Sequence, residues 1–195
     1  MFVIGLKLVK IVAMRRIWGL ARDEFGVAAI TAAVVVVVGV EQGIILAILL
    51  SIALHVKRHY TPHDAVVTWT ADGKPKMQKP IPGTRSEPGL IVYRFPVGIF
   101  YANSVRLAEA VLGLVNVPDP PRWFVLVADA IDDVDYTGGT TLLEVAEGLE
   151  KRGIVLAIAE AGDDVLRELR RFGVLDHVAP KHLFDTVDEA HAAFH

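Results

Sequence analysis

Cysteine is absent from this chain of 195 residues. Its absence excludes disulfide bonds, thiolate metal sites and a cysteine nucleophile, and it removes the usual indication of redox compartment. The chain is also too short for two large domains, because domains usually have about 100 to 150 residues. The length therefore allows one ordinary domain and an additional segment.

Recognisable catalytic arrangements are missing as well. The sequence has no Ser-His-Asp pattern and no carboxylate pair with a partner base. His55, His59 and His63 recur at helical spacing, but a proline interrupts that helix. Four carboxylates suit Mg²⁺, although no calcium-loop or phosphate-binding motif accompanies them. They are Asp129, Asp132, Asp133 and Asp135. We predict that the chain is not an enzyme and uses no metal or cofactor.

Strongly polar residues are scarce in one stretch. Apolar residues make up 53% of the chain, and the mean hydropathy is +0.44. From Gly26 to Leu54 run 29 residues whose only strongly polar members are Glu41 and Gln42. So long an apolar run indicates a membrane segment. A secretory signal peptide is a poor alternative, because the run starts too late, is too long and lacks a cleavage pattern after it.

The balance of basic and acidic residues changes just after the apolar run. Residues 1–61 contain seven basic and three acidic residues, whereas residues 62–195 contain thirteen basic and twenty acidic ones. Basic residues also lie on both sides of the apolar run. By the positive-inside rule, both flanks are expected to be cytoplasmic.

Two arrangements of the apolar run compete. A single helix would be about 43 Å long, would need a strong tilt across a core of about 30 Å, and would place Glu41 near the middle. A hairpin would instead form two short helices over residues 25–38 and 44–54, joined by a polar turn. The turn residues are Gly39, Glu41, Gln42 and Gly43. The flanking charges favour the hairpin, and we predict two short membrane helices within residues 25–60.

The residues before and after this hairpin have different characters. Residues 1–24 end in a basic segment with Trp18, which is typical of the end of a membrane helix entering the interface. An amphipathic interfacial helix remains an alternative. Residues 61–88 are rich in proline, glycine and lysine, and we predict a linker there with one short strand near residues 65–70.

The last part of the chain, residues 89–195, alternates strand and helix patterns. This order predicts an α/β domain in which helices pack against a mixed or largely parallel sheet. The predicted strands cover residues 90–95, 97–101, 123–128, 154–159 and 183–184, and the predicted helices cover 104–115, 139–152, 163–172 and 186–194.

One loop of this domain has the composition of a functional site. Asp135, Tyr136, Thr137 and Gly138 follow a buried strand and precede a helix, and α/β sheets usually place their sites at such positions. A phosphate on Thr137 would gain amide hydrogen bonds but face several aspartates, so phosphorylation would be a local charge switch. The alternative is that Asp135, Thr137 or Thr140 merely caps the helix.

The same four residues carry a family resemblance. The sequence Asp135-Tyr136-Thr137-Gly138 resembles the Asp-Ser/Thr-Ser/Thr-Gly loop of STAS domains, and the order of strands and helices over residues 89–195 is similar too. Residues 15–25 and 39–44 resemble the final membrane helices of SulP-type (sulfate permease) anion transporters. The resemblance therefore covers essentially the whole chain.

The resemblance implies a function for the chain. It implies the C-terminal part of an inorganic anion transporter of the sulfate type, with the last membrane helices and a regulatory, interaction-mediating STAS domain. Such a protein would be a multi-pass protein of the inner (plasma) membrane with a cytoplasmic C-terminal domain. Its implied partners are membrane lipid, the rest of the transporter and a second copy of itself, without nucleic acid.

The resemblance also implies a role for the loop. In sigma-regulating members of the family the hydroxyl residue before the glycine is phosphorylated, and that residue is Thr137 here. Tyr136 departs from the family pattern and weakens the case for kinase recognition. A kinase or regulatory protein is the implied partner of this loop. The alternative function is a membrane-tethered STAS module that acts as a phospho-switched signalling partner resembling an anti-sigma factor antagonist.

Overall fold

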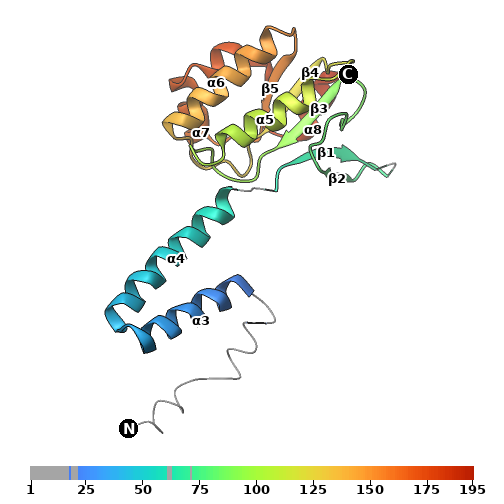
Figure 1. Cartoon of the computed structure of the whole chain (residues 1–195). Coiled ribbons are helices and arrows are strands. Elements are labelled where there is room, and N and C mark those ends of the chain that lie inside the picture. Colours follow the sequence, from blue (N-terminus) through green and yellow to red (C-terminus); the bar gives the residue numbers. More distant parts are fainter. Residues whose placement is uncertain (1–17, 19–21, 61–62, 71) are drawn as a thin grey trace. The chain divides into compact units, whose positions relative to one another are not determined.

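The computed structural model describes residues 18, 22–60, 63–70 and 72–195. The chain divides into two compact units, Met1–Arg58 and His59–His195. Most of the predicted interfacial segment, residues 1–24, lies outside the described residues. Figure 1 shows a helical first unit and a second unit in which helices cover a sheet.

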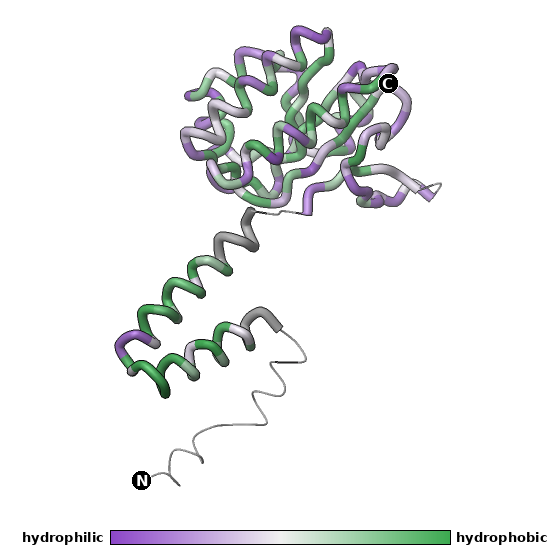
Figure 2. The backbone as a smooth tube through the Cα atoms, viewed as in Figure 1, coloured by the Kyte–Doolittle hydropathy of each residue, from purple (hydrophilic) through white to green (hydrophobic). Residues whose placement is uncertain are grey.

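The first unit contains the helices α3, Arg22–Val37, and α4, Val40–Tyr60. Both helices are hydrophobic along most of their described length (Figure 2). They approach closely at Gly43, where an added Cβ atom would lie 2.2 Å from Cγ2 of Val35. The predicted pair of helices is therefore present, and Gly43 permits its close packing.

The turn between these helices is shorter than predicted. Gly39, with a φ of 149°, separates the helices, while Glu41, Gln42 and Gly43 already belong to the first turn of α4. A carboxylate is favourable there because the N-terminus of a helix carries a partial positive charge. Of the predicted turn residues Gly39, Glu41, Gln42 and Gly43, only Gly39 therefore lies outside the helices.

Within the described part of the chain, no helix combines the length and the apolar composition needed to cross a bilayer.

The second unit is built on a six-stranded mixed sheet with the order β2-β1-β3-β4-β5-β6. Strands β3 to β6 are parallel, and β1 is antiparallel to both of its neighbours. The strands are β1 Ala65–Trp69, β2 Pro75–Gln78, β3 Leu90–Arg94, β4 Trp123–Val127, β5 Val155–Ala159 and β6 Leu183–Phe184. The predicted α/β class with a mixed sheet is confirmed.

The sheet begins earlier in the sequence than the sequence analysis placed the domain. Strand β1 lies where a short strand was predicted, but it pairs with β3 and is a full member of the sheet. Strand β2 was not predicted, because its four residues are all exposed and show no alternation of polar and apolar side chains. Residues 61–88 thus contain two strands of the sheet as well as connecting loops.

Helices cover both faces of this sheet. Helices α5 to α7 pack on one face with Tyr93, Phe95 and Phe124 at the centre of the core, and α8 packs on the opposite face against Val92 and Val125. Figure 1 shows this layering. The helices are α5 Ser104–Val115, α6 Tyr136–Glu150, α7 Asp163–Arg171 and α8 Val187–Phe194, with short 3₁₀ turns at Val174–His177 and Pro180–His182.

One predicted strand, over residues 97–101, is absent. The segment forms a single bridge, between Ile99 and Val134. Pro96 precedes it and lacks the backbone N–H group that a continued ladder would need. The segment instead becomes a loop at the carboxyl end of β3, beside the loop that follows β4.

Candidate functional site

The predicted regulatory loop lies at the carboxyl end of β4 and is fixed by the Asp135 carboxylate. Asp135 is the N-cap of α6, and its Oδ1 accepts a hydrogen bond of 2.7 Å from the backbone N–H of Gly138. Its Oδ2 accepts one of 3.0 Å from the backbone N–H of Tyr101. A single carboxylate therefore holds the start of α6 and the loop after β3 together.

Two glycines let the neighbouring segments approach the start of α6. A Cβ atom at Gly138 would lie 2.3 Å from the carbonyl oxygen of Ile99, and one at Gly139 would lie 2.3 Å from the Phe172 ring. Both glycines are buried. Their lack of a side chain is thus required by packing, since φ is positive at neither of them.

The hydroxyl of Thr137 remains free at the surface. Thr137 is exposed, and the ring of Tyr136 is 77% exposed. Thr140 donates its hydroxyl to the carbonyls of Tyr136 and Thr137, at 3.1 and 3.0 Å. Among the described residues, the Thr137 hydroxyl has no hydrogen-bond partner. Of the three residues that could cap the helix, the structure assigns that role to Asp135, which leaves Thr137 accessible.

The other aspartates around the loop have separate roles. Asp129 forms a bidentate pair with Arg94 over distances of 2.7 to 3.0 Å, and these hydrogen bonds raise the pKa of Arg94. Asp133 accepts a hydrogen bond from the backbone N–H of Val134. Asp132 is exposed. The structure therefore places four carboxylates near one edge of the sheet, with Asp129, Asp133 and Asp135 already hydrogen-bonded to other groups.

The loop after β3 is held by a buried amide. Asn103 is fully buried; its Oδ1 accepts a hydrogen bond from Phe100 N–H, and its Nδ2 donates to the Gly98 carbonyl. These bonds satisfy the polar atoms of the side chain and close the loop on itself. The loop is thus held by its own hydrogen bonds as well as by the one to Asp135.

A buried polar group that sequence reasoning missed also lies near the start of α5. Asp64, whose side chain is 2% exposed, accepts hydrogen bonds from Tyr93 (2.7 Å) and Arg106 (3.1 Å). Burial, and then the bond to Asp64, raises the pKa of Tyr93 well above its ordinary value. Asp64 was overlooked because it lies in the segment interpreted as a linker.

This group borders an open groove of about 540 Å³. Asp64 and Arg106 lie along it, and Lys79 and the exposed Ile81 come from the segment after β2. Because its lining combines charged and apolar side chains, the groove offers both kinds of contact to a ligand.

Comparison with known proteins identifies the family. Residues 82–190, more than half of the chain, match the STAS domain. The chain belongs to the STAS domain family. The STAS match includes the strands β3 to β6 and the loop at Asp135, so the resemblance inferred from that loop is confirmed.

Known relatives extend the similarity beyond the STAS domain. A protein of Mycobacterium tuberculosis strain H37Rv, described as a probable sulfate transporter, is 33% identical over 193 residues, with 97% of this chain and 34% of that protein covered. Sulfate transporter 3.1 of Arabidopsis thaliana is 23% identical over 119 residues, covering 56% of this chain and 18% of that protein. The resemblance to sulfate transporters is thus confirmed, and the chain spans about one third of the length of the mycobacterial relative.

A solved structure has the same fold over nearly the whole chain. The murine Solute Carrier 26 family member A9 anion transporter, in its inward-facing state, matches with a TM-score of 0.79 over 96% of this chain and 30% of that one. The sequence identity is 14%, so the match establishes the fold alone.

Proposed function

We propose that the chain works as the STAS-bearing part of a secondary inorganic anion transporter of the sulfate type. The observation that carries the proposal is the 33% identity to a protein described as a sulfate transporter, which extends over 97% of this chain and so includes α3 and α4. A STAS domain working alone would not need these helices. In this proposal they belong to the membrane domain, the STAS domain lies in the cytoplasm, and the protein resides in the plasma membrane.

The exposed apolar side chains of the helices support a larger membrane assembly. Val36 and Val37, at the end of α3, are 84% and 82% exposed, and Ile48 and Leu49 of α4 are more than half exposed. Apolar surface of this extent requires lipid or other helices around it. We propose that the rest of the transporter and the bilayer supply these contacts, and that two copies of the protein associate.

Anion uptake tests this function. Cells that lack their own sulfate uptake should take up labelled sulfate when they express the protein from the complete gene encoding this sequence. Gly43→Val should abolish uptake, because the added side chain would collide with Val35. Gly26→Val is the matched control, since nothing lies within 4 Å of a Cβ atom at Gly26. Lack of uptake by the parent protein, despite normal membrane insertion, would contradict the proposal and favour a tethered signalling module.

We propose further that Asp135, Tyr136, Thr137 and Gly138 form a regulatory loop that is modified on Thr137. The hydroxyl of Thr137 is exposed and uncommitted, while Asp135 alone caps the helix. A kinase or another regulatory protein could therefore reach Thr137 without breaking the cap. A phosphate there would stand near Asp132 and Asp133 and would add negative charge to an acidic edge.

Phosphate transfer from labelled ATP in a cell extract of the source organism tests this loop. The parent chain and Thr140→Ala should incorporate phosphate, whereas Thr137→Ala should not. Equal labelling of Thr137→Ala and the parent would show that the modified residue lies elsewhere.

A further inference from the structure

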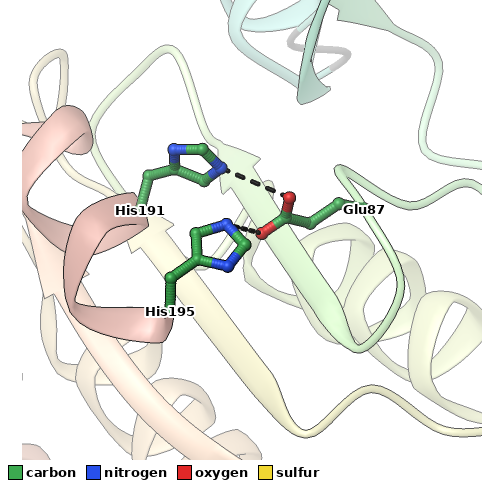
Figure 3. A group of neighbouring side chains, drawn as sticks. All are labelled: Glu87, His191 and His195. Atoms are coloured by element: carbon green, nitrogen blue, oxygen red, sulfur yellow. Dashed lines mark ion pairs between the residues drawn. The ribbon is translucent and has the colours of Figure 1, made fainter.

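Three side chains of metal-binding types converge beside the end of α8. Glu87 lies in the segment that leads into β3, and its carboxylate faces the rings of both His191 and His195 (Figure 3). Its Oε2 is 3.4 Å from Nε2 of His191, and its Oε1 is 3.1 Å from Nε2 of His195. One ligand atom from each residue lies within 4.8 Å of the other two. No other group of three or more His, Asp and Glu side chains in the described part of the chain has ligand atoms this close together.

His191 lies in the last turn of α8 and His195 is the C-cap residue directly after it, so the two rings are about one helical turn apart. Residues four positions apart lie on the same face of a helix, one turn from each other. The ring centroids of His191 and His195 are 5.0 Å apart, with an interplanar angle of 87°. Two histidines at this spacing are a recurrent way of binding Zn²⁺ from a helix. The pair therefore presents two imidazole nitrogens toward one point.

Neighbouring groups hold the three side chains in place. Trp69 of β1 stacks on the His191 ring, with centroids 4.2 Å apart and an interplanar angle of 24°. Backbone hydrogen bonds between Glu87 and Leu90, of 3.0 and 3.3 Å, fix the segment that carries the carboxylate. Buried Oε1 of Glu87 makes no hydrogen bond within the described residues, although it is close to His195. A buried carboxylate oxygen without a hydrogen bond is costly unless a cation lies near it.

We propose that Glu87, His191 and His195 bind a divalent transition-metal ion, with Zn²⁺ as the natural occupant. Two imidazole nitrogens and one carboxylate are a known ligand set for Zn²⁺, with bonds of about 2.0 to 2.2 Å. The fourth position of a tetrahedral ion remains open to water or to an outside ligand. This site is independent of the transport function proposed above.

The bound ion would fasten the end of α8 to the segment before β3. Glu87 and the two histidines are far apart in the sequence, so the ion would cross-link the last helix to the start of the STAS domain. A ligand that binds the folded state alone raises its stability by an amount that grows with the logarithm of the free ligand concentration above Kd. We therefore expect Zn²⁺ to raise the melting temperature of the second unit.

Metal titration of the full chain tests the proposal. The chain is purified in detergent without an affinity tag, stripped of metal with a chelator and titrated with Zn²⁺ by calorimetry and with Co²⁺ by visible absorption. We expect one ion per chain and the absorption bands of tetrahedral Co²⁺. Glu87→Gln, His191→Asn and His195→Asn should each weaken Zn²⁺ binding at least about tenfold, because even residues that only support a ligand contribute about 10- to 100-fold.

The chain offers a matched control in His177. Its Nδ1 pairs with Glu150 at 2.7 Å, so His177→Asn also removes a histidine–carboxylate pair, and it should leave Zn²⁺ affinity unchanged. His195→Asn is the safest test of the site, because the His195 side chain is 60% exposed and the variant is expected to fold. Zn²⁺ binding that is as tight in His195→Asn and Glu87→Gln as in the parent, or that has no defined stoichiometry, would overturn the proposal.

Fluorescence gives a second, independent readout. Trp69 lies against His191, so a paramagnetic ion such as Cu²⁺ bound at this site should quench its emission. His195→Asn should lose most of this quenching, because it removes an exposed ligand without changing a tryptophan. Quenching by Cu²⁺ that is as strong in His195→Asn as in the parent would contradict the site.

Discussion

At the scale of single residues, Asp135 is the side chain on which the regulatory loop depends. It contacts the start of α6 and the loop after β3 at once. Sequence reasoning found this residue but could not decide between Asp135, Thr137 and Thr140 as the cap, because all three are common at helix starts. The choice depends on backbone geometry: Asp135 has the extended conformation of an N-cap residue.

Substitutions at Asp135 and Thr137 should differ in their effect on stability. Asp135→Ala should lower the free energy of unfolding by about 1 to 2 kcal/mol, because it removes the cap of α6 and the bond to Tyr101. Thr137→Ala should change it by less than about 0.5 kcal/mol, since the Thr137 side chain is exposed. Urea denaturation followed by circular dichroism measures both. A larger loss for Thr137→Ala than for Asp135→Ala would contradict the assignment of the cap.

Tyr93 makes a buried bond whose loss should be costly. Tyr93→Phe leaves the Asp64 carboxylate with Arg106 as its remaining side-chain partner and should cost about 1 to 3 kcal/mol of stability. Tyr101→Phe is the control, because Tyr101 is 67% exposed, and it should cost less than about 0.5 kcal/mol. Chemical denaturation compares the two variants, and equal costs would show that the Tyr93 hydroxyl does not stabilise Asp64.

His182 should make the folding stability of the domain depend on pH. Burial, and then the charge of Lys181, lowers the pKa of His182 below its ordinary value of 6.5. The unfolded chain therefore binds more protons than the folded one as the pH falls below 6.5, so His182 should lower stability in that range and have no effect above it. His182→Gln should lose less stability than the parent between pH 7 and pH 5.5, measured by thermal melting. A steeper loss of stability in His182→Gln than in the parent would contradict this prediction. An NMR titration midpoint of His182 above 6.5 would contradict it as well.

At the scale of helices and strands, periodicity identified the elements that have one clear apolar face. Helix α5 has the predicted bounds, because its buried residues recur at helical spacing. Helix α6 begins earlier than predicted, since Gly138 and Gly139 look like loop residues in sequence but are buried in the first turn. Strand β2 escaped prediction because it is exposed on both faces. Glycines that serve close packing, and exposed edge strands, thus leave no periodic pattern.

The close packing at Gly138 can be tested within α6. Gly138→Ala would push a methyl group against the Ile99 carbonyl and should cost about 1 to 3 kcal/mol of stability. Gly148→Ala, in the same helix, meets nothing closer than 3.5 Å and should be neutral or stabilising by up to about 1 kcal/mol. If denaturation curves showed Gly138→Ala to be as stable as Gly148→Ala, the described contact between the Ile99 loop and α6 would be wrong.

At the scale of the whole molecule, the sequence revealed the division into an apolar helical part and an α/β domain. This division can be read from the sequence, because a long apolar run and an alternation of strand and helix patterns are both visible in short stretches of sequence. The convergence of Glu87, His191 and His195 was not predictable, and the sequence analysis predicted no metal. It depends on α8 crossing to the face of the sheet opposite α5 to α7, which no local pattern specifies.

We propose that this chain belongs to an inorganic anion transporter. The most direct measurement is sulfate uptake by proteoliposomes that contain the purified protein from the complete gene encoding this sequence. We expect saturable uptake above that of empty liposomes, and we expect Gly43→Val but not Gly26→Val to abolish it. A folded protein that moves neither sulfate nor another inorganic anion under any imposed gradient would contradict this proposal.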